Sequence, residues 1–326
     1  MSFMKLRPDS FYAALAETPE GIVCCRPSWR KERERRERIV SQGIDWSGFD
    51  RSWSGTGMKK IRSLMQKTPL YRQGVLNSLK IHTVTEELFH PNLPAACDGY
   101  TILHLSDPHF GTLPEIDDAI LQATDNQQCD LCLLTGDYRA SLPHSHDHAL
   151  AKMRLLLQGI PARDGFVATL GNHDRVCMVN PLEEMGYRVL INEEATVHRQ
   201  NAAIHLLGLD DTYFFPTRMA LAKLSAPRQE GFNILLVHSP EIAAIAARHG
   251  FDLYLCGHTH GGQVCWPTGK PIMTNMRQGC KQHGQGLWRH GTMIGRTSNG
   301  LGSSSVPIRF FNHPECVRIV LRAGRI

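Results

Sequence analysis

The sequence predicts an α/β fold, in which short buried strands alternate with helices, and three observations indicate it. From Gly99 onward, five apolar runs of four to six residues are each followed closely by Gly, Asp, Asn or His. The runs are apolar at nearly every position, as expected for strands covered on both faces. Longer stretches of mixed polarity and helical length separate them. Together these features predict a sandwich whose strands are buried between other layers.

The predicted elements follow one another from residue 100. We expect strands at residues 100–105, 131–134, 166–170, 234–237 and 253–256. We expect helices at residues 116–126, 148–158 and 240–249. Open α/β sheets bind ligands beyond the carboxyl ends of their strands, so the residues after each strand are the place to look for chemistry.

The first 96 residues differ from the rest, and we expect residues 1–96 to form a partly helical extension ahead of a larger domain at residues 97–326. A mixed-charge cluster at residues 30–38 is typical of a solvated helix. A basic amphipathic stretch at residues 58–81 is interrupted by Pro69. That stretch either covers the larger domain or lies on an anionic membrane.

The composition is that of a globular protein with a sizeable core: 326 residues, of which 42% are hydrophobic and 21% charged. Ten cysteines are too few for a disulfide scaffold, and Cys129 and Cys132 lie beside an apolar run that indicates core packing. Residues 1–20 contain no apolar signal sequence, and no apolar run is long enough to span a bilayer. We therefore expect a cytoplasmic protein whose membrane contact is at most peripheral.

Potential metal ligands follow each of the five predicted strands. In chain order they are Asp107, His109, Asp137, Asn172, His238, His258 and His260. A single residue of this kind is often a helix cap or a structural histidine, but five strand ends in succession are not explained in that way. Oxygen and imidazole donors without thiolates favour Mn²⁺, Fe or Zn²⁺ at a reactive site over a closed structural zinc site.

The ordered series resembles that of the calcineurin-like metallophosphoesterase family, whose motifs run D-x-H, G-D, G-N-H-[DE], H and G-H-x-H. The resemblance covers residue 99 to the C-terminal end, and it implies a four-layer α/β/β/α sandwich with two divalent metal ions at one sheet edge. It implies that one ion binds Asp107, His109, Asp137 and His260. The other ion would bind Asp137, Asn172, His238 and His258. Mn²⁺ is the expected metal, with Fe or Zn²⁺ as alternatives.

The expected reaction is phosphoester hydrolysis by a hydroxide that bridges the two metal ions. The resemblance implies that His173 faces the substrate phosphate, with Asp174 holding its ring in position. Many relatives have a second acid after the G-D motif, where this sequence has Arg139 and no acid. Arg139 is either a contact to the substrate phosphate or a surface residue. We interpret the H-x-H-x-H cluster at residues 144–148 as a polar loop outside the site.

Two flanking segments, residues 92–100 and 298–310, are similar to those of the YaeI/YkuE-like phosphodiesterases. That branch includes the LpxG type of UDP-2,3-diacylglucosamine pyrophosphatase, which releases UMP and lipid X in lipid A synthesis. The resemblance implies a UDP-linked acylated sugar as substrate and peripheral contact with the cytoplasmic face of the inner membrane. An apolar segment, residues 213–216 with Met219, Leu221 and Leu224, either contacts an acyl chain or membrane surface or packs beneath a loop or helix.

Two other functions compete with this interpretation. One is a phosphodiesterase or phosphatase for nucleotides or other soluble phosphoesters, and the other is a metal-bound scaffold without turnover. The complete ligand set and the intact Asn172-His173-Asp174 motif argue against the scaffold. Nucleic acid is not expected as a partner, because the formal charge is only +5 and no basic stripe is interleaved with the aromatic residues.

Overall fold

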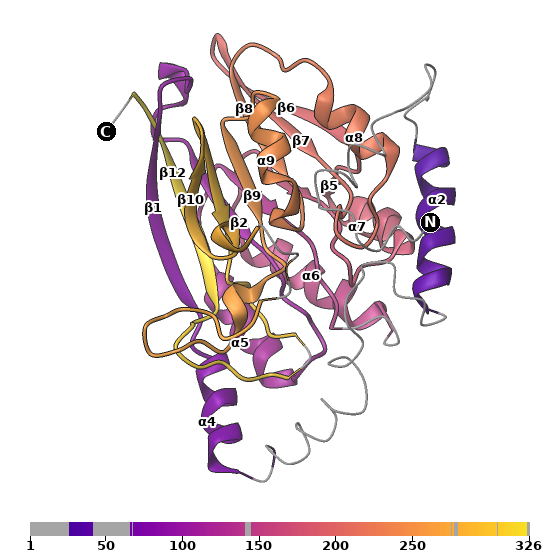
Figure 1. Cartoon of the computed structure of the whole chain (residues 1–326), viewed down its shortest axis with the longest axis vertical. Coiled ribbons are helices and arrows are strands. Elements are labelled where there is room, and N and C mark those ends of the chain that lie inside the picture. Colours follow the sequence, from indigo (N-terminus) through magenta and orange to yellow (C-terminus); the bar gives the residue numbers. More distant parts are fainter. Residues whose placement is uncertain are drawn as a thin grey trace.

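The computed structural model describes residues 26–41, 66, 68–140, 145–274, 276, 280–304 and 306–324. Its centre is two six-stranded sheets packed face to face, with helices on their outer faces (Figure 1). One apolar core lies between the two sheets. A second lies between the first sheet and its helices, and a third lies between the second sheet and its helices. The predicted four-layer α/β/β/α sandwich is confirmed.

The first sheet has the strand order β1-β12-β2-β3-β4-β5. Its strands are β1 (His82–His90), β2 (Thr101–Leu105), β3 (Leu131–Leu134), β4 (Phe166–Ala168), β5 (Tyr187–Val189) and β12 (Glu315–Ala323). The second sheet has the order β10-β11-β9-β8-β7-β6. Its strands are β6 (Glu193–Arg199), β7 (Ala202–Gly208), β8 (Phe232–Leu236), β9 (Leu253–Cys256), β10 (Gly286–His290) and β11 (Met293–Thr297). The five predicted strands correspond to β2, β3, β4, β8 and β9.

Strand β3 illustrates why the central strands are mostly apolar. Leu131 and Leu133 belong to the core between the two sheets. Cys132 and Leu134 belong to the core beneath the outer helices. Successive side chains of a strand point to opposite faces, so a strand covered on both sides needs apolar residues at every position. The predicted core packing of Cys132 and its neighbour Cys129 is confirmed.

The helices cover the outer faces of both sheets. Helices α5 (Pro114–Thr124), α6 (Asp147–Gly159) and α7 (Val179–Met185) cover the first sheet, and α8 (Arg218–Ser225) and α9 (Ala243–Arg248) cover the second. The helix predicted at residues 240–249 is divided into a 3₁₀ turn, Pro240–Ile242, and α9, because the backbone of Ile242 leaves the helical region. Further 3₁₀ turns are Ala95–Cys97, Val176–Met178, His260–Gly262 and Lys281–His283. No helix among the described residues is both long and apolar enough to cross a membrane.

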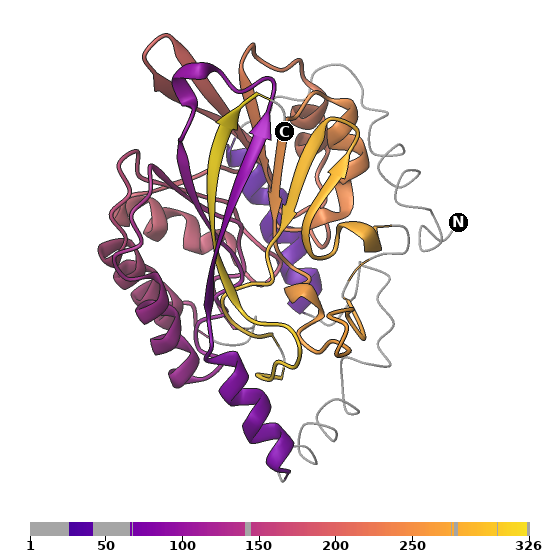
Figure 2. The ribbon, with the colours of Figure 1, turned by 90° about the vertical axis from the view of Figure 1, so that its left-hand side faces the viewer.

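Strand β1 belongs to the sandwich, although it falls within the segment assigned from the sequence to an extension. It pairs in parallel with β12 from His82 opposite Glu315 to His90 opposite Ala323. Figure 2 shows the two strands side by side. Nine residues of the predicted extension are therefore part of the first sheet.

Helix α2 (Arg26–Ser41) contains the mixed-charge cluster for which a solvated helix is expected. That expectation is wrong for one face, because Trp29 and Arg33 are 2% and 0% exposed. Arg33 forms an ion pair with Asp210, with 2.7 Å between Nη1 and Oδ1, and its guanidinium lies 3.4 Å from the ring centroid of Phe215. Trp29 donates from Nε1 to the other oxygen of Asp210 at 2.6 Å. Removing either partner of such a buried ion pair typically costs about 3–5 kcal/mol, so this contact fixes α2 on the body.

Helix α4 (Pro69–Ser78) is the helix described within the basic amphipathic stretch, of which residues 58–65 lie outside the described residues. It packs against residues 307–310, where the backbone N–H of Arg309 donates to the carbonyl of Gly74 at 3.0 Å. Leu70 and Leu76 on the same helix are 64% and 44% exposed. One face of α4 therefore covers the larger domain, as one of the two alternatives predicts.

The apolar segment at residues 213–216 is mostly part of the core, and only Phe214 in it is partly exposed. Tyr213, Phe215 and Leu224 are 0–2% exposed, and Met219 and Leu221 are 5% and 6% exposed. The packing alternative is therefore confirmed. These buried side chains do not form a surface for an acyl chain.

Candidate metal centre

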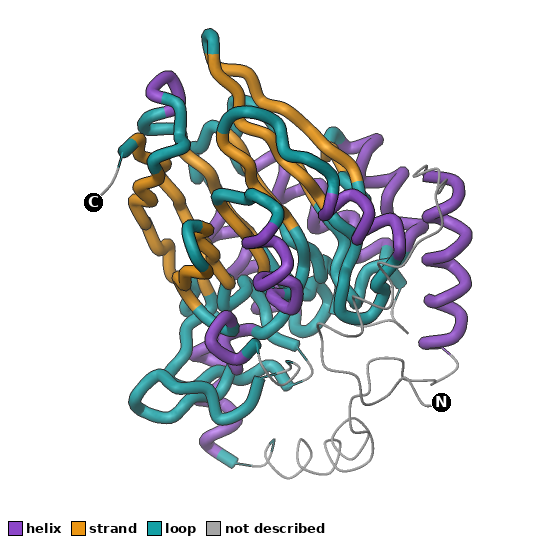
Figure 3. The backbone as a smooth tube through the Cα atoms, turned by 45° about the horizontal axis from the view of Figure 1, so that its top comes forward, coloured by secondary structure: helices purple, strands orange, loops and turns teal. Residues whose placement is uncertain are grey.

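The predicted ligands gather at one end of the two sheets, in the loops that follow β2, β3, β4, β8 and β9 (Figure 3). Those strands are parallel within each sheet, so their carboxyl ends meet. Five of the seven predicted ligands have left-handed backbone conformations, with φ between 45° and 70°: Asp107, His109, Asp137, His258 and His260. Residues other than glycine rarely adopt this conformation, and such strain concentrates at functional sites.

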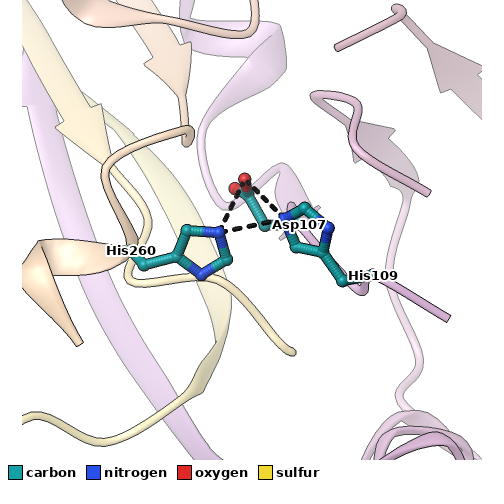
Figure 4. A group of neighbouring side chains, drawn as sticks. All are labelled: Asp107, His109 and His260. Carbon is teal, nitrogen blue, oxygen red and sulfur yellow. Dashed lines mark hydrogen bonds and ion pairs between the residues drawn. The ribbon is translucent and has the colours of Figure 1, made fainter. Parts of the chain in front are cut away.

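We refer to Asp107, His109 and His260 as the Asp107 group; their side chains are buried and point toward one another (Figure 4). Nε2 of His260 lies 3.4 Å from Oδ1 of Asp107 and 3.0 Å from Nε2 of His109. Nδ1 of His109 lies 3.2 Å from the carbonyl oxygen of Arg139. We therefore assign the proton of His109 to Nδ1, which leaves a lone pair on Nε2.

We refer to Asn172, His238 and His258 as the Asn172 group. Oδ1 of Asn172 lies 3.0 Å from Nε2 of His238 and 2.9 Å from Nδ1 of His258. The two imidazole nitrogens are 3.2 Å apart. Nδ1 of His238 donates to the carbonyl oxygen of Thr135 at 2.7 Å, so Nε2 is the nitrogen that faces the group and becomes a ligand when it loses its proton.

Asp137 lies between the two groups. Its Oδ2 is 3.5 Å from Nε2 of His109 and 3.2 Å from Nε2 of His238. Its Oδ1 accepts the backbone N–H of His173 at 2.7 Å, which holds the carboxylate in this orientation. One oxygen of Asp137 thus faces both groups, and a carboxylate placed in this way can bridge two cations.

The donor atoms of the two groups fit divalent cations. Lone pairs on nitrogen and oxygen converge at distances that are repulsive unless a positive charge lies between them. Although burial lowers the pKa of His238, the charge and hydrogen bond of Asp137 together with the charges of Asp107 and Asp211 raise that pKa to about 10, so a cation bound here must displace a proton. Burial lowers the pKa of His109 to about 3, so its ring is neutral and available as a ligand. Imidazole, amide and carboxylate donors suit Mn²⁺, Fe and Zn²⁺.

His173 lies over Asp137 and is more accessible than the predicted ligands. Its Nε2 is 3.9 Å from Oδ2 of Asp137, and its ring meets that of His109 edge-on with centroids 4.8 Å apart. Its side chain is 25% exposed, whereas none of the predicted ligands exceeds 8%. Arg139 is only 1% exposed, so the surface-residue alternative for it is wrong. Its Nε donates to the carbonyl oxygen of His173 at 2.5 Å.

Asp174 contacts the backbone of two site loops rather than holding the ring of His173. Its Oδ2 accepts the N–H of Gly171 and that of Asp137, each at 2.8 Å, and its Oδ1 accepts the N–H of Tyr138 at 2.9 Å. A fully buried carboxylate needs several donors, and these amides lie nearest to it. Asp174 therefore ties the G-N-H-D loop to the G-D loop.

The H-x-H-x-H cluster does not join the candidate ligands. His144 lies outside the described residues. His148 is exposed on the first turn of α6, where its Nε2 lies 2.6 Å from Oδ2 of the buried Asp117. His146 and His148 belong to none of the groups of described side chains that are arranged to hold a metal ion.

Arg33 is a residue of the site region that sequence reasoning missed. Its Nη2 donates to the carbonyl oxygens of Gly171 and Asp174, at 3.0 Å each, so α2 supports the G-N-H-D loop from behind. Within a run of arginines nothing distinguishes Arg33 by residue type. The available signal is spacing: Trp29, Arg33 and Glu37 recur every four residues and therefore share one helix face.

Arg309 supports the Asp107 group in a similar way. It is fully buried, and its Nη2 donates to the carbonyl oxygens of Gly302 at 2.6 Å and Asn299 at 2.7 Å. Its two terminal nitrogens also lie 3.4 Å from the carbonyl oxygen and from Nδ1 of His260. Burial lowers the pKa of Arg309 to about 10, which leaves it charged at neutral pH. The only sequence signal for Arg309 is that residues 298–310 resemble the YaeI/YkuE-like phosphodiesterases.

Two motif glycines allow the site loops to approach the carboxylates. A Cβ at Gly257 would lie 2.0 Å from Oδ2 of Asp107, and a Cβ at Gly171 would lie 2.2 Å from Oδ1 of Asp137. No side chain fits at either distance, so the close approach of these loops requires glycine.

Comparison with known proteins identifies the family. Residues 100–262, half of the chain, match the family described as calcineurin-like phosphoesterase, and all seven predicted ligands lie in that range. YkoQ, an uncharacterized metallophosphoesterase of Bacillus subtilis, is 29% identical over 231 residues, which cover 66% of this chain and 80% of YkoQ. YkuE of the same organism, also an uncharacterized metallophosphoesterase, is 29% identical over 260 residues, with 74% and 84% covered. Phosphodiesterase YaeI of Escherichia coli is 29% identical over 216 residues, with 63% and 76% covered. The chain therefore belongs to the calcineurin-like phosphoesterase family and is a metal-dependent phosphoesterase.

Proposed function

We propose that the protein hydrolyses phosphodiester or pyrophosphate bonds at a centre of two divalent cations, with Mn²⁺ as the preferred metal. The Asp107 group and Asp137 would hold one cation, and the Asn172 group and Asp137 would hold the other. The observation that carries this proposal is the position of Asp137 Oδ2, which faces Nε2 of His109 and Nε2 of His238 at once. When bound, two such cations supply a hydroxide near neutral pH and neutralise the phosphate oxygens.

The chain's own contribution to the reaction centres on His173. Because its ring is partly exposed beside Asp137, it can donate a hydrogen bond to the substrate phosphate and a proton to the leaving oxygen. Arg139 and Asp174 are buried, and we propose them as positioning residues: Arg139 through the carbonyl of His173, and Asp174 through the loop amides. This assignment replaces a direct contact between Arg139 and the phosphate.

For the natural substrate we propose UDP-2,3-diacylglucosamine, cleaved to UMP and lipid X in contact with the membrane that contains it. The support is the resemblance of residues 92–100 and 298–310 to the YaeI/YkuE-like branch, together with the phosphodiesterase name of the YaeI relative. Burial of Tyr213 and Phe215 favours a second candidate, a phosphodiesterase for soluble nucleotides, because it removes most of one surface for acyl chains.

The first experiment follows UMP release from UDP-2,3-diacylglucosamine in detergent by Mn²⁺-loaded protein, with Asp137→Ala as the blank. We expect release that depends on Asp137. The lipid-linked substrate is wrong if UMP does not appear while bis-p-nitrophenyl phosphate is hydrolysed in a metal-dependent manner. The two-cation centre itself is wrong if Asp137→Ala hydrolyses both compounds at the wild-type rate.

A further inference from the structure

The exposed apolar side chains are concentrated at one end of the molecule. Eight large hydrophobic side chains are exposed in the described part of the chain, at 44–64%, and six of them lie on three short segments. The six are Leu70 and Leu76 on α4, Trp266, Ile272 and Met273 in the loop after the G-H-x-H motif, and Phe311 near the C-terminal strand. We refer to these six residues as the apolar end. Large exposed apolar side chains that gather in one region mark a candidate interaction site.

The three segments pack together at one end of the molecule, although Leu76 lies about 200° around α4 from Gly74 and so points away from the other two segments. The N–H of Cys265 donates to the carbonyl of Phe310 at 2.9 Å, which joins the loop to the C-terminal segment. A Cβ at Gly74 of α4 would lie within 3 Å of the side chains of Ile308 and Phe310, which joins the helix to the same segment. Figures 1 and 2 both place α4 at the end of the molecule opposite the end of β12, with the orange and yellow loops next to the helix.

The charges in this region are of one sign. Arg72, Lys80 and Lys270 are exposed on the same segments. Residues 68–80, 263–274 and 306–313 contain no aspartate or glutamate. The region therefore combines protruding apolar side chains, including a tryptophan, with a positive charge.

The apolar end also adjoins the metal centre. The side-chain amide of Asn312, next to Phe311, donates to the carbonyl oxygens of His260 and Gly261 at 2.8 and 2.7 Å. The loop that carries Trp266 begins directly after the G-H-x-H motif. A surface that receives the apolar end would therefore lie beside the loop that carries His260.

We propose that the apolar end docks the protein on an anionic phospholipid bilayer. Tryptophan is enriched where proteins meet the membrane interface, and each Lys or Arg near an anionic surface contributes about 1 kcal/mol, a roughly fivefold gain in binding. Aliphatic tips on separate segments can each insert between headgroups without a shaped partner. The proposal deepens the membrane contact of the proposed function and rests on it for its setting, but its test needs no lipid-linked substrate.

The test is sedimentation of the full chain with vesicles. We expect binding to vesicles with about a third phosphatidylglycerol, weaker binding to pure phosphatidylcholine, and a loss of binding as salt screens the charges. The triple variant Trp266→Ser, Ile272→Ser, Met273→Ser should bind the anionic vesicles at least about tenfold more weakly, since each side chain forfeits on the order of 1 kcal/mol of apolar transfer. The matched control is Leu155→Ser, an exposed leucine on α6 outside the apolar end, which should bind as the wild type does.

Three outcomes would overturn the proposal: no vesicle binding by the wild type, undiminished binding by the triple variant, or a dimer that the triple variant disrupts in size-exclusion chromatography. Hydrolysis of bis-p-nitrophenyl phosphate by the triple variant checks that its metal centre is intact. Vesicle binding without UMP release would leave the docking surface standing and reject the proposed substrate. UMP release in detergent without vesicle binding would support the proposed substrate and reject the docking surface.

Discussion

The Asp107 group and the Asn172 group are supported from opposite ends of the chain. Arg309, in the C-terminal segment, holds the loops around the Asp107 group, and Arg33, in α2, holds the loop that carries Asn172. Both arginines are fully buried and donate to backbone carbonyls, and both lie outside the residues that match the family. The two arginines differ in what they contact at the metal centre. Arg309 also contacts the ring of the candidate ligand His260, whereas Arg33 contacts only the backbone of the loop that carries Asn172. The motifs therefore supply the ligands, and segments beyond the motifs keep them in place.

The largest expected effect is that of Asp137→Ala, because it removes the one side chain that both groups share. We expect loss of both cations and of essentially all hydrolysis of bis-p-nitrophenyl phosphate. Isothermal titration with Mn²⁺ and the hydrolysis rate measure the two losses. Retention of one tight Mn²⁺ step would mean that one group binds its cation without Asp137.

His173→Ala should leave both groups intact and slow the chemistry. We expect kcat to fall by about 10²–10⁴-fold, the usual contribution of one acid or base, while both Mn²⁺ binding steps keep their affinity. Loss of a Mn²⁺ step would instead make His173 a metal ligand. His148→Ala, which removes an exposed histidine on α6, is the control and should change neither measurement.

Arg309→Ala should weaken cation binding by the Asp107 group and leave cation binding by the Asn172 group unchanged. Residues that orient metal ligands typically contribute about 10–100-fold in metal affinity, and we expect a loss in that range for one of the two Mn²⁺ steps. His260→Ala and His238→Ala assign the steps to the two groups. Arg322→Ala, which removes an exposed ion pair on β12, is the matched control. Equal losses of Mn²⁺ affinity in both binding steps would show that Arg309 does not act on the Asp107 group alone.

The pH dependence of metal binding should also separate the groups. Burial raises the pKa of Asp107 to about 7, so below that pH a proton competes with the cation of the Asp107 group. The pKa of His238 is raised to about 10, so a proton competes in the Asn172 group at any lower pH. Between pH 7 and 9 we expect the Mn²⁺ affinity of the Asn172 group to rise by about tenfold per pH unit and that of the Asp107 group to stay level. Parallel titration curves for the two steps would contradict this assignment.

Arg33→Ala should have the smallest effect on the metal centre, because it acts only through backbone carbonyls. We expect the Asn172 step to weaken by about tenfold, at the lower end of the usual range, with the Asp107 step unchanged. Arg33→Lys should restore little, because a lysine cannot pair with Asp210 and donate to two carbonyls in the same fixed geometry. Arg35→Ala, an exposed arginine of the same helix, is the control. Unchanged Mn²⁺ binding in Arg33→Ala would limit the arginine to anchoring α2.

The central strands and the candidate ligands could be predicted from the sequence, because both follow from local patterns. In the structure these ligands lie together at the ends of those strands. Apolar runs of strand length predict β2, β3 and β9, and the polar residues after them necessarily meet where parallel strands end. Contacts between distant segments are not encoded in that way. Arg33 and Asp210 are 177 positions apart, and no local period indicates that they pair. The environment of residues 213–216 could not be predicted for a related reason, since an apolar run has the same sequence pattern in a core and on a lipid-facing surface.

The parallel pairing of β1 with β12 determines when the enzyme can acquire its activity. In the first sheet β12 lies between β1 and β2, although it follows both of them in the chain. During synthesis β1 and β2 therefore emerge with a gap between them, which is filled only after residues 315–323 have been made. Arg309, just ahead of β12, arrives equally late. Pairing across so many residues is slow to form, so we expect a nascent chain to carry most of its metal ligands long before it can hold them in working order.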